Sequence, residues 1–258
     1  MAEMVSRQKI DSIFNLVALL SAVGEAKPQT AWQVNIGALM NSLEVARQYN
    51  CALFTPSSIG AFGPSSPKDK TPQDTVMRPT TMYGVCKVTG EMLGDYYHSR
   101  FGVDTRSVRF PGLISNVTLP GGGTTDYAVE IYYEAIRSGR FTCPVPGDVY
   151  MDMMYMPDAL RARVELMEDD PKKVVHRNSF NIASMSFTPE IIYAEIKKRL
   201  PDFTMDYDVD PVKKAIAESW PNSLDDTCAR EEWGWKPEWD LSSMTDDMLE
   251  VIRKKNLK

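Results

Sequence analysis

The sequence predicts an α/β fold in which helices cover a parallel sheet. Two observations support this class. Apolar, strand-like segments alternate with segments of helical periodicity through the first half of the chain. Their order is strand, helix, strand, helix, strand, with spacings that suit helical connections between parallel strands. The second half is less regular and contributes more helix than strand.

In the first half, each element has a local signal. An apolar stripe predicts the first long helix, and its members are Val34, Ala38, Leu39, Leu43 and Ala46. The next long helix should begin near Thr81 or Tyr83, because Pro79 stands just ahead of it. The expected elements are strands at 11–18, 51–58 and 104–110, helices at 31–50 and about 81–100, and a loop at 111–116.

In the second half, two helix starts are marked by proline. One helix should begin near Pro157, and another should have Thr188 as its cap and Pro189 at its first position. The remaining expected elements are a helix at 125–139, a short strand region after 141, a strand at 178–183 and at least two helices in 219–255.

Composition excludes several classes of function. The chain has 258 residues, 43% hydrophobic and 25% charged, as in an ordinary globular protein. A formal net charge of −6 disfavours nucleic acid as a partner, and the longest apolar run, 13–23, is too short to cross a membrane. The four cysteines and two histidines are scattered along the chain, so no metal site is expected. We expect a soluble, intracellular protein: cytoplasmic if bacterial, with a mitochondrial location open if eukaryotic.

The segment "TTMYGVCK" places Tyr83 and Lys87 four residues apart on a predicted helix, so both project from one face. A lysine ammonium beside a phenol stabilises the phenolate and favours proton exchange with a substrate hydroxyl. This spacing is also common on solvated helix faces. Ser58 ends a predicted strand 25 residues earlier, at the edge where parallel sheets bind ligands, although it could simply form a turn.

At this point the sequence resembles a known superfamily. "PSSIGAFG", "RPTTMYGVCK" and "RFPGLIS" are similar to successive signatures of the extended short-chain dehydrogenases/reductases. The segments "LPGGGTTDYAVEIYYEAI", "MYMPDALRA", "FNIASMSFTPEII" and "SWPNSLDDTCAREEWGWKPEWDL" resemble the metal-free L-threonine 3-dehydrogenases within it. The resemblance implies a Rossmann-type sheet with a small C-terminal substrate lobe, a homodimer, and NAD-dependent oxidation of L-threonine to 2-amino-3-oxobutyrate.

The resemblance also implies roles for individual residues. Tyr83 would be the general base, Lys87 would support it and hold the nicotinamide ribose, and Ser58 would position the substrate hydroxyl. Asn35 would organise a water near the lysine, or else be an exposed helix residue. Further cofactor contacts would come from Leu16, Val17, Ala18, Phe110, Pro111 and Gly112, and further substrate contacts from Ser21, Thr81, Gly123 and Thr124.

Two other features have alternative interpretations. The glycines at 121–123 would let backbone N–H groups approach a substrate carboxylate, or they could form only a flexible turn and a helix cap. The tryptophans at 220, 233, 235 and 239 are expected to pack in the core of the C-terminal lobe, and Trp220 could border the cleft.

The superfamily's GxxGxxG phosphate-binding loop does not occur in residues 1–258. We therefore expect an N-terminally truncated sheet with an unpaired apolar edge strand and weakened NAD binding. The expected division is an incomplete NAD-binding domain, 1–118 with 146–184, and a substrate lobe, 119–145 with 185–258. Two alternatives to the dehydrogenase are a nucleotide-sugar epimerase or dehydratase and a non-catalytic fragment or pseudoenzyme.

Overall fold

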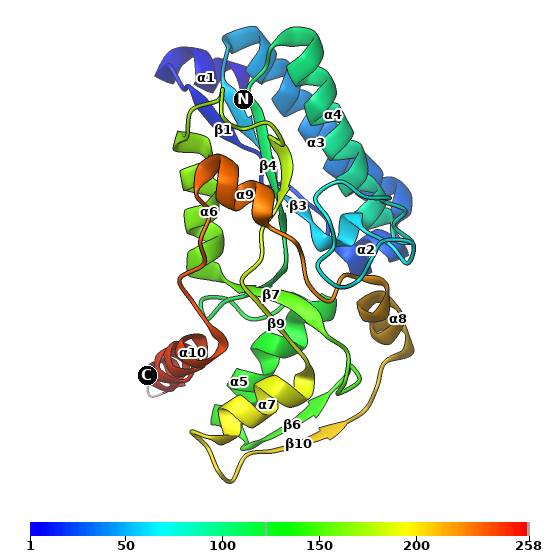
Figure 1. Cartoon of the computed structure of the whole chain (residues 1–258), viewed down its shortest axis with the longest axis vertical. Coiled ribbons are helices and arrows are strands. Elements are labelled where there is room, and N and C mark those ends of the chain that lie inside the picture. Colours follow the sequence, from blue (N-terminus) through cyan, green and yellow to red (C-terminus); the bar gives the residue numbers. More distant parts are fainter. Residues whose placement is uncertain (122, 257–258) are drawn as a thin grey trace.

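The main sheet contains five strands (Figure 1). All of its pairings are parallel, as the sequence predicted. The computed structural model describes residues 1–121 and 123–256. The strands run in the order β1-β2-β4-β3, and β8 also pairs with β4. Their bounds are β1 Ser12–Phe14, β2 Ala52–Phe54, β3 Ser57–Ser58, β4 Thr105–Phe110 and β8 Asn178–Asn181.

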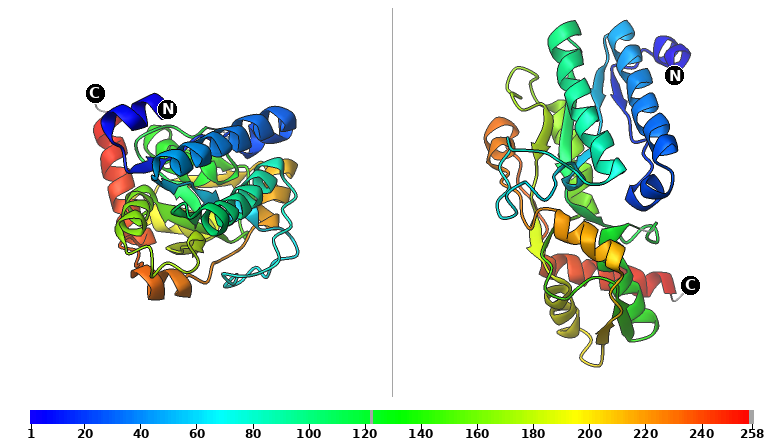
Figure 2. Two further views of the ribbon diagram at one scale, coloured as in Figure 1. Left: turned by 90° about the horizontal axis from the view of Figure 1, so that it is seen from above. Right: turned by 90° about the vertical axis from the view of Figure 1, so that its right-hand side faces the viewer.

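Helices cover both faces of this sheet. Successive strand residues point to opposite faces, and here Leu53 packs with helices α3 (Pro28–Tyr49) and α4 (Met82–Phe101). Its neighbour Phe54 packs with α6 (Met156–Glu168) and α9 (Thr227–Trp233). Helices α3 and α4 lie side by side, and Figure 2 shows α9 across the sheet from them.

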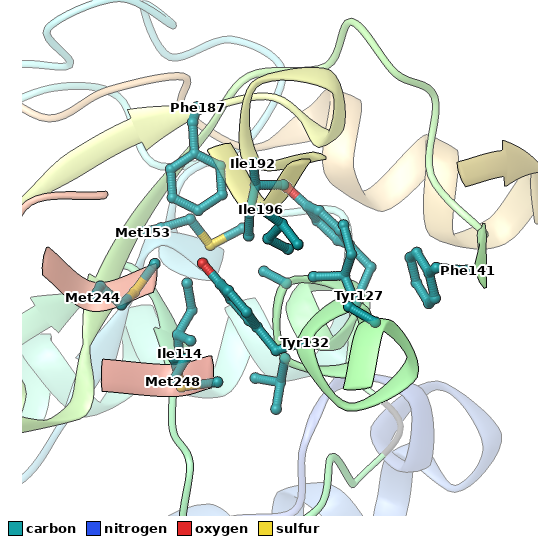
Figure 3. Packing of buried hydrophobic residues seen from close by; sticks show 14 of the residues in the cluster. Ile114, Tyr127, Tyr132, Phe141, Met153, Phe187, Ile192, Ile196, Met244 and Met248 are labelled. Carbon is teal, nitrogen blue, oxygen red and sulfur yellow. The ribbon is translucent and has the colours of Figure 1, made fainter. Parts of the chain in front are cut away.

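A smaller lobe holds the second large core (Figure 3). Two small sheets border it: β6 (Arg140–Cys143) with β10 (Thr204–Tyr207), and β5 (Gly112–Ile114) with β7 (Met151–Tyr155) and β9 (Met185–Phe187). Tyr132 lies in this core, and its hydroxyl is 2.7 Å from that of Thr245. The lobe's helices are α5 Tyr127–Arg137, α7 Pro189–Lys197, α8 Pro211–Ser219 and α10 Leu241–Asn256.

Several expected boundaries are confirmed and others are wrong. Helix α4 begins directly after Thr81, and Thr188 caps α7 with Pro189 at its first position. The strand expected at 51–58 is split into β2 and β3, because Pro56 has no N–H to donate to a ladder. The loop expected at 111–116 instead contains β5. Three further short helices, α1 (Ala2–Gln8), α2 (Ser21–Ala26) and the 3₁₀ turn η1 (Ile59–Ala61), had no clear sequence signal.

Residues 185–258 were expected to belong wholly to the lobe, with their tryptophans in the lobe core. Two of these tryptophans pack elsewhere. Trp233 and Trp235 join the core under the main sheet, with Val108 and Phe180, rather than the lobe core. Helix α9 is therefore attached to the sheet domain. The rest of the predicted division stays a prediction.

Strand β1 forms one end of the sheet and pairs, among the described strands, with β2 alone. The expected apolar edge is present: Phe14 is 41% exposed and Leu16 is 53% exposed. The Arg163 guanidinium lies 5.8 Å from the centroid of the Phe14 ring and partly covers it. Among the described residues, no helix is both long enough and apolar enough to cross a membrane.

A buried carboxyl group, Asp152 in β7, makes stability depend on pH. One of its oxygens accepts from the Leu224 amide at 2.9 Å, and the other has no partner among the described residues. Burial raises the pKa of Asp152 well above its ordinary value of 3.8, and the nearby charge of Asp226 raises it further. The folded chain thus holds a proton that the unfolded chain releases, so the free energy of unfolding falls as pH rises above about 4.

We expect Asp152→Asn to flatten this dependence, because asparagine has no proton to release. The free energy of unfolding, measured in urea, should fall between pH 5 and pH 8 for the wild type. This fall should exceed that of Asp152→Asn by on the order of 1 kcal/mol or more. Asp148→Asn, at an exposed position, is the matched control and should follow the wild type. Parallel profiles for wild type and Asp152→Asn would contradict this assignment.

Candidate active site

A cleft of about 340 Å³ opens where the main sheet meets the lobe. Such a volume suits a small molecule. It lies at the carboxyl ends of β1, β3 and β4, where parallel sheets bind ligands. The lining residues are Leu16, Ala18, Leu20, Ser21, Pro56, Ser57, Ser58, Ile59, Tyr83, Lys87, Phe110, Pro111, Gly112, Leu113, Gly123, Thr124, Thr125, Asp126 and Trp220.

Tyr83 and Lys87 come from the first two turns of α4 and both line the cleft. The Lys87 Nζ lies 5.2 Å from the centroid of the Tyr83 ring. It donates a 2.6 Å hydrogen bond to the Pro56 carbonyl. The break between β2 and β3 therefore provides an acceptor for the lysine. This hydrogen bond holds the ammonium beside the Tyr83 ring.

Ser58 lies against the same tyrosine. A Cβ built on Gly60 would sit 3.2 Å from Cδ1 of Tyr83 and 3.5 Å from Oγ of Ser58, so both side chains flank this glycine. Ser58 also caps η1, because its Oγ accepts from the Gly60 amide at 3.1 Å. Its hydroxyl hydrogen can still point to a ligand in the cleft.

The start of α4 packs unusually close to the Ser58 turn. A Cβ on Gly84 would lie 2.2 Å from the Gly60 carbonyl oxygen, which is backbone and cannot move aside. Only glycine permits this approach. The Thr81 Oγ accepts from the Gly84 amide at 3.1 Å, which fixes the first turn and therefore the position of Tyr83.

A buried ion pair joins helix α4 to strand β4 next to the cleft. Glu91, one turn beyond Lys87, accepts two bonds from Arg109, from Nε at 3.0 Å and from Nη2 at 2.9 Å. It also accepts a short hydrogen bond from the Ser57 hydroxyl. Arg109 continues the network to the Gln73 carbonyl and to the Asn181 side chain. The residue beside Ser58 is thus tied to the helix that carries Tyr83.

Asn35 is not an exposed helix residue. Its side chain accepts from the Leu19 amide at 2.7 Å and donates to the Leu19 carbonyl at 3.2 Å, which fixes the loop after β1. A separate cavity of about 40 Å³ is lined by both Asn35 and Lys87. That space is large enough for a water molecule between them.

The residues implicated in substrate binding are only partly brought together. Ser21, Gly123 and Thr124 line the cleft. Trp220 also borders it, which is one of the two positions that the sequence left open for this residue. Thr81 does not line it: this residue is buried and caps α4. The Gly123 amide donates to Asp126 at 2.6 Å in the 3₁₀ turn η2 (Thr124–Asp126). Gly122, the middle residue of the predicted glycine loop, lies outside the described residues.

The residues implicated in cofactor binding follow a similar pattern. Leu16, Ala18 and the Phe110–Pro111–Gly112 backbone line the cleft. Val17 instead borders the small cavity behind Lys87. The sequence analysis missed Glu91 and Arg109. The signal was available, because Glu91 continues the spacing of Tyr83 and Lys87 along one helix face.

A parallel sheet with a serine at a strand end, beside a helix that carries tyrosine and lysine, defines the class of the protein as a short-chain dehydrogenase/reductase of the extended kind. More particularly, the chain belongs to the NAD dependent epimerase/dehydratase family, whose model matches residues 1–183. It is therefore an NAD-dependent oxidoreductase by family.

Individual relatives refine this placement. An uncharacterized epimerase/dehydratase of Staphylococcus haemolyticus is 58% identical over 99% of this chain and 80% of its own length. The L-threonine dehydrogenase of Clostridium difficile is 57% identical, with a TM-score of 0.98 over 100% of this chain and 81% of its own. A monomeric L-threonine 3-dehydrogenase from a metagenome is 43% identical, with a TM-score of 0.95 over 99% of this chain and 82% of its own.

Proposed function

We propose that the protein oxidises L-threonine to 2-amino-3-oxobutyrate with NAD. One observation carries the choice of substrate. Among the described residues that line the cleft, Lys87 is the only cation, while hydroxyls are contributed by serine, threonine and tyrosine. A nucleotide-sugar needs several cations to hold its diphosphate, whereas a small amino acid does not. Similarity to threonine dehydrogenases of known structure supports the same substrate.

The residues present fit the nicotinamide end of NAD. The Lys87 ammonium and the Tyr83 phenol can hold a ribose, and the backbone from Phe110 to Gly112 borders the cleft opposite them. The small Ala18 and the apolar Leu16 leave room beside them for a flat ring. When bound, NAD supplies the acceptor for the hydride that leaves C3 of the substrate. No GxxGxxG segment in residues 1–258 accounts for its pyrophosphate.

In this proposal the chain's own groups hold the substrate hydroxyl and remove its proton. The Ser58 Oγ, placed beside Tyr83 across Gly60, donates to the hydroxyl oxygen. The Tyr83 phenolate accepts the proton, and the adjacent Lys87 ammonium stabilises that phenolate before the transfer. A water in the cavity that Asn35 and Lys87 line would take this proton on, which restores the phenolate for the next turnover.

The amino acid backbone of the substrate would be held across the cleft. The Ser21 hydroxyl at the start of α2 and the Gly123–Thr124 turn face this space from opposite elements. The hydroxyls of Ser21 and Thr124 can donate to a carboxylate. Thr81 acts on substrate only through its cap on α4, which positions Tyr83.

We also propose a homodimer formed through α3 and α4. Val85, Met92 and Tyr96 are exposed and share one face of α4, since they are spaced by seven and four residues. An apolar stripe of this kind is typical of a helix interface. Sedimentation equilibrium should show a dimer that Met92→Glu dissociates; a wild type that is monomeric at micromolar concentration, like the metagenome relative, would contradict the proposal.

The substrate assignment is tested by NADH absorbance in parallel assays with L-threonine and with UDP-glucose, at millimolar NAD⁺ and the same protein concentration. We expect NADH only with threonine, and none with D-threonine as the stereochemical control. Oxidation or epimerisation of the UDP-sugar without threonine turnover would favour the nucleotide-sugar alternative and overturn the proposal.

A further inference from the structure

A second polar cluster lies outside the cleft, on the α9 side of the main sheet. It comprises His176, just before β8, with Cys228 and Glu232 on α9. One ligand atom from each of these three residues lies within 4.8 Å of the others. Asp74, in the segment that joins η1 to α4, adds a carboxylate oxygen 3.6 Å from the His176 Nε2. None of the four residues lines the cleft.

Glu232 orients the histidine. One of its oxygens accepts from the Val175 and His176 amides, at 2.5 and 3.1 Å. The other receives a short hydrogen bond from the His176 Nδ1. Because a carboxylate only accepts, Nδ1 donates this hydrogen bond, which leaves Nε2 on the side of Cys228 and Asp74. A carboxylate behind a histidine is the arrangement that commonly supports metal-ligating imidazoles.

The two other possible donors lie close to the His176 Nε2. The His176 Nε2 lies 4.0 Å from the Cys228 Sγ and 3.6 Å from the Asp74 Oδ2. Ligands of tetrahedral zinc are about 3.3–3.7 Å apart, given metal–ligand distances of about 2.0–2.3 Å. The separation of Nε2 from the Asp74 oxygen already lies in this range, and that of Nε2 from the Cys228 sulfur is slightly longer. The Asp74 side chain is 87% exposed, so it can move toward an ion without disturbing the core. Solvent can then reach the fourth coordination position of the ion.

The charge around the thiol also favours a cation. Four carboxylates lie near the Cys228 thiol, those of Glu232, Asp225, Asp74 and Glu231. A divalent ion would offset this negative field and stabilise the thiolate.

We propose that His176, Cys228 and Asp74 bind a divalent cation of the zinc class, with Glu232 holding the imidazole and water completing the coordination. The ion is structural. It joins the start of β8, α9 and the segment before α4. That segment is already tied to the sheet by the Gln73 side chain, which accepts from the Asn181 amide at 2.8 Å and donates to the Ser179 carbonyl at 2.9 Å.

A metal site at this position was not expected from the sequence. That expectation depended on sequence spacing, and His176 and Cys228 are 52 residues apart in the chain. The fold brings them together because Phe180 and Trp233, close to them in sequence, pack edge to face with ring centroids 5.9 Å apart in the core below.

The test uses Co²⁺ as a spectroscopic probe for the 258-residue chain, reduced and stripped of metal by a chelator. We expect one equivalent of Co²⁺ to produce a thiolate-to-cobalt charge-transfer band that Zn²⁺ abolishes by displacement. Cys228→Ser should lose the band, while Cys51→Ser, at a buried cysteine remote in sequence, should keep it. His176→Gln should lose binding, and His98→Gln, at the chain's other histidine, should not.

Two further variants separate ligation from folding. Glu232→Gln should weaken Co²⁺ binding by about 10–100-fold. Asp74→Asn changes an exposed side chain, so it should fold normally, by circular dichroism, and still weaken binding by at least about 10-fold. The proposal is overturned if the wild type gives no charge-transfer band, if Cys228→Ser keeps it, or if folded Asp74→Asn binds as tightly as the wild type.

Discussion

Tyr83→Phe is expected to lower the kcat for threonine oxidation by about 10²–10⁴-fold, the usual contribution of a positioned general base. Removing the hydroxyl leaves no group beside Ser58 that can take the substrate proton, while the ring still fills its place against Gly60. KM should change much less, because the substrate's carboxylate is held by other elements. Steady-state NADH formation at several pH values measures the effect.

Tyr96→Phe is the matched control, because Tyr96 lies on the same helix but is 52% exposed and lies outside the cleft lining. It should retain wild-type kcat. Equal losses in the two variants would indicate a general effect on α4 rather than lost proton transfer. Retention of more than about a tenth of the activity by Tyr83→Phe would remove the tyrosine from its proposed role.

Glu91→Ala is expected to destabilise the fold by about 3–5 kcal/mol, the usual cost of breaking a buried ion pair from one side. Glu91 and Arg109 have side chains only 4% and 5% exposed, and the variant would leave the Arg109 charge without its carboxylate. It would also release the Ser57 hydroxyl next to Ser58. Urea unfolding followed by circular dichroism measures the loss.

Glu250→Ala provides the comparison, because Glu250 pairs with Lys254 on the exposed surface of α10. Its expected cost is below about 1 kcal/mol. Glu91→Gln should recover part of the loss, since the amide can still accept from Arg109. A Glu91→Ala variant as stable as Glu250→Ala would show that the network around Ser57 does not hold the sheet and α4 together.

The part of the site that could be predicted from sequence is the part with local spacing. Tyr83 and Lys87 are four residues apart on one helix, and the cap and proline before α4 mark its start. The parallel sheet followed from alternating strand and helix patterns. Ser58 was found because a strand end is a recognisable position.

What could not be predicted depends on tertiary contacts. Asn35 binds the Leu19 backbone 16 residues earlier, and no helical pattern signals such a partner. The Gly84 contact with Gly60 follows from how closely two segments approach. Trp233 and Trp235 were placed in the wrong core, because their apolar character does not indicate which apolar surface they cover.

The central claim is that the Ser58–Tyr83–Lys87 cleft oxidises threonine at C3. L-Threonine deuterated at C3 tests it most directly. We predict that deuterium is recovered in the reduced cofactor by mass spectrometry, that turnover slows relative to unlabelled threonine when chemistry limits the rate, and that Tyr83→Phe abolishes the transfer. Reduced cofactor without deuterium, or no threonine-dependent reduction from protein that binds NAD⁺ calorimetrically, would contradict the account.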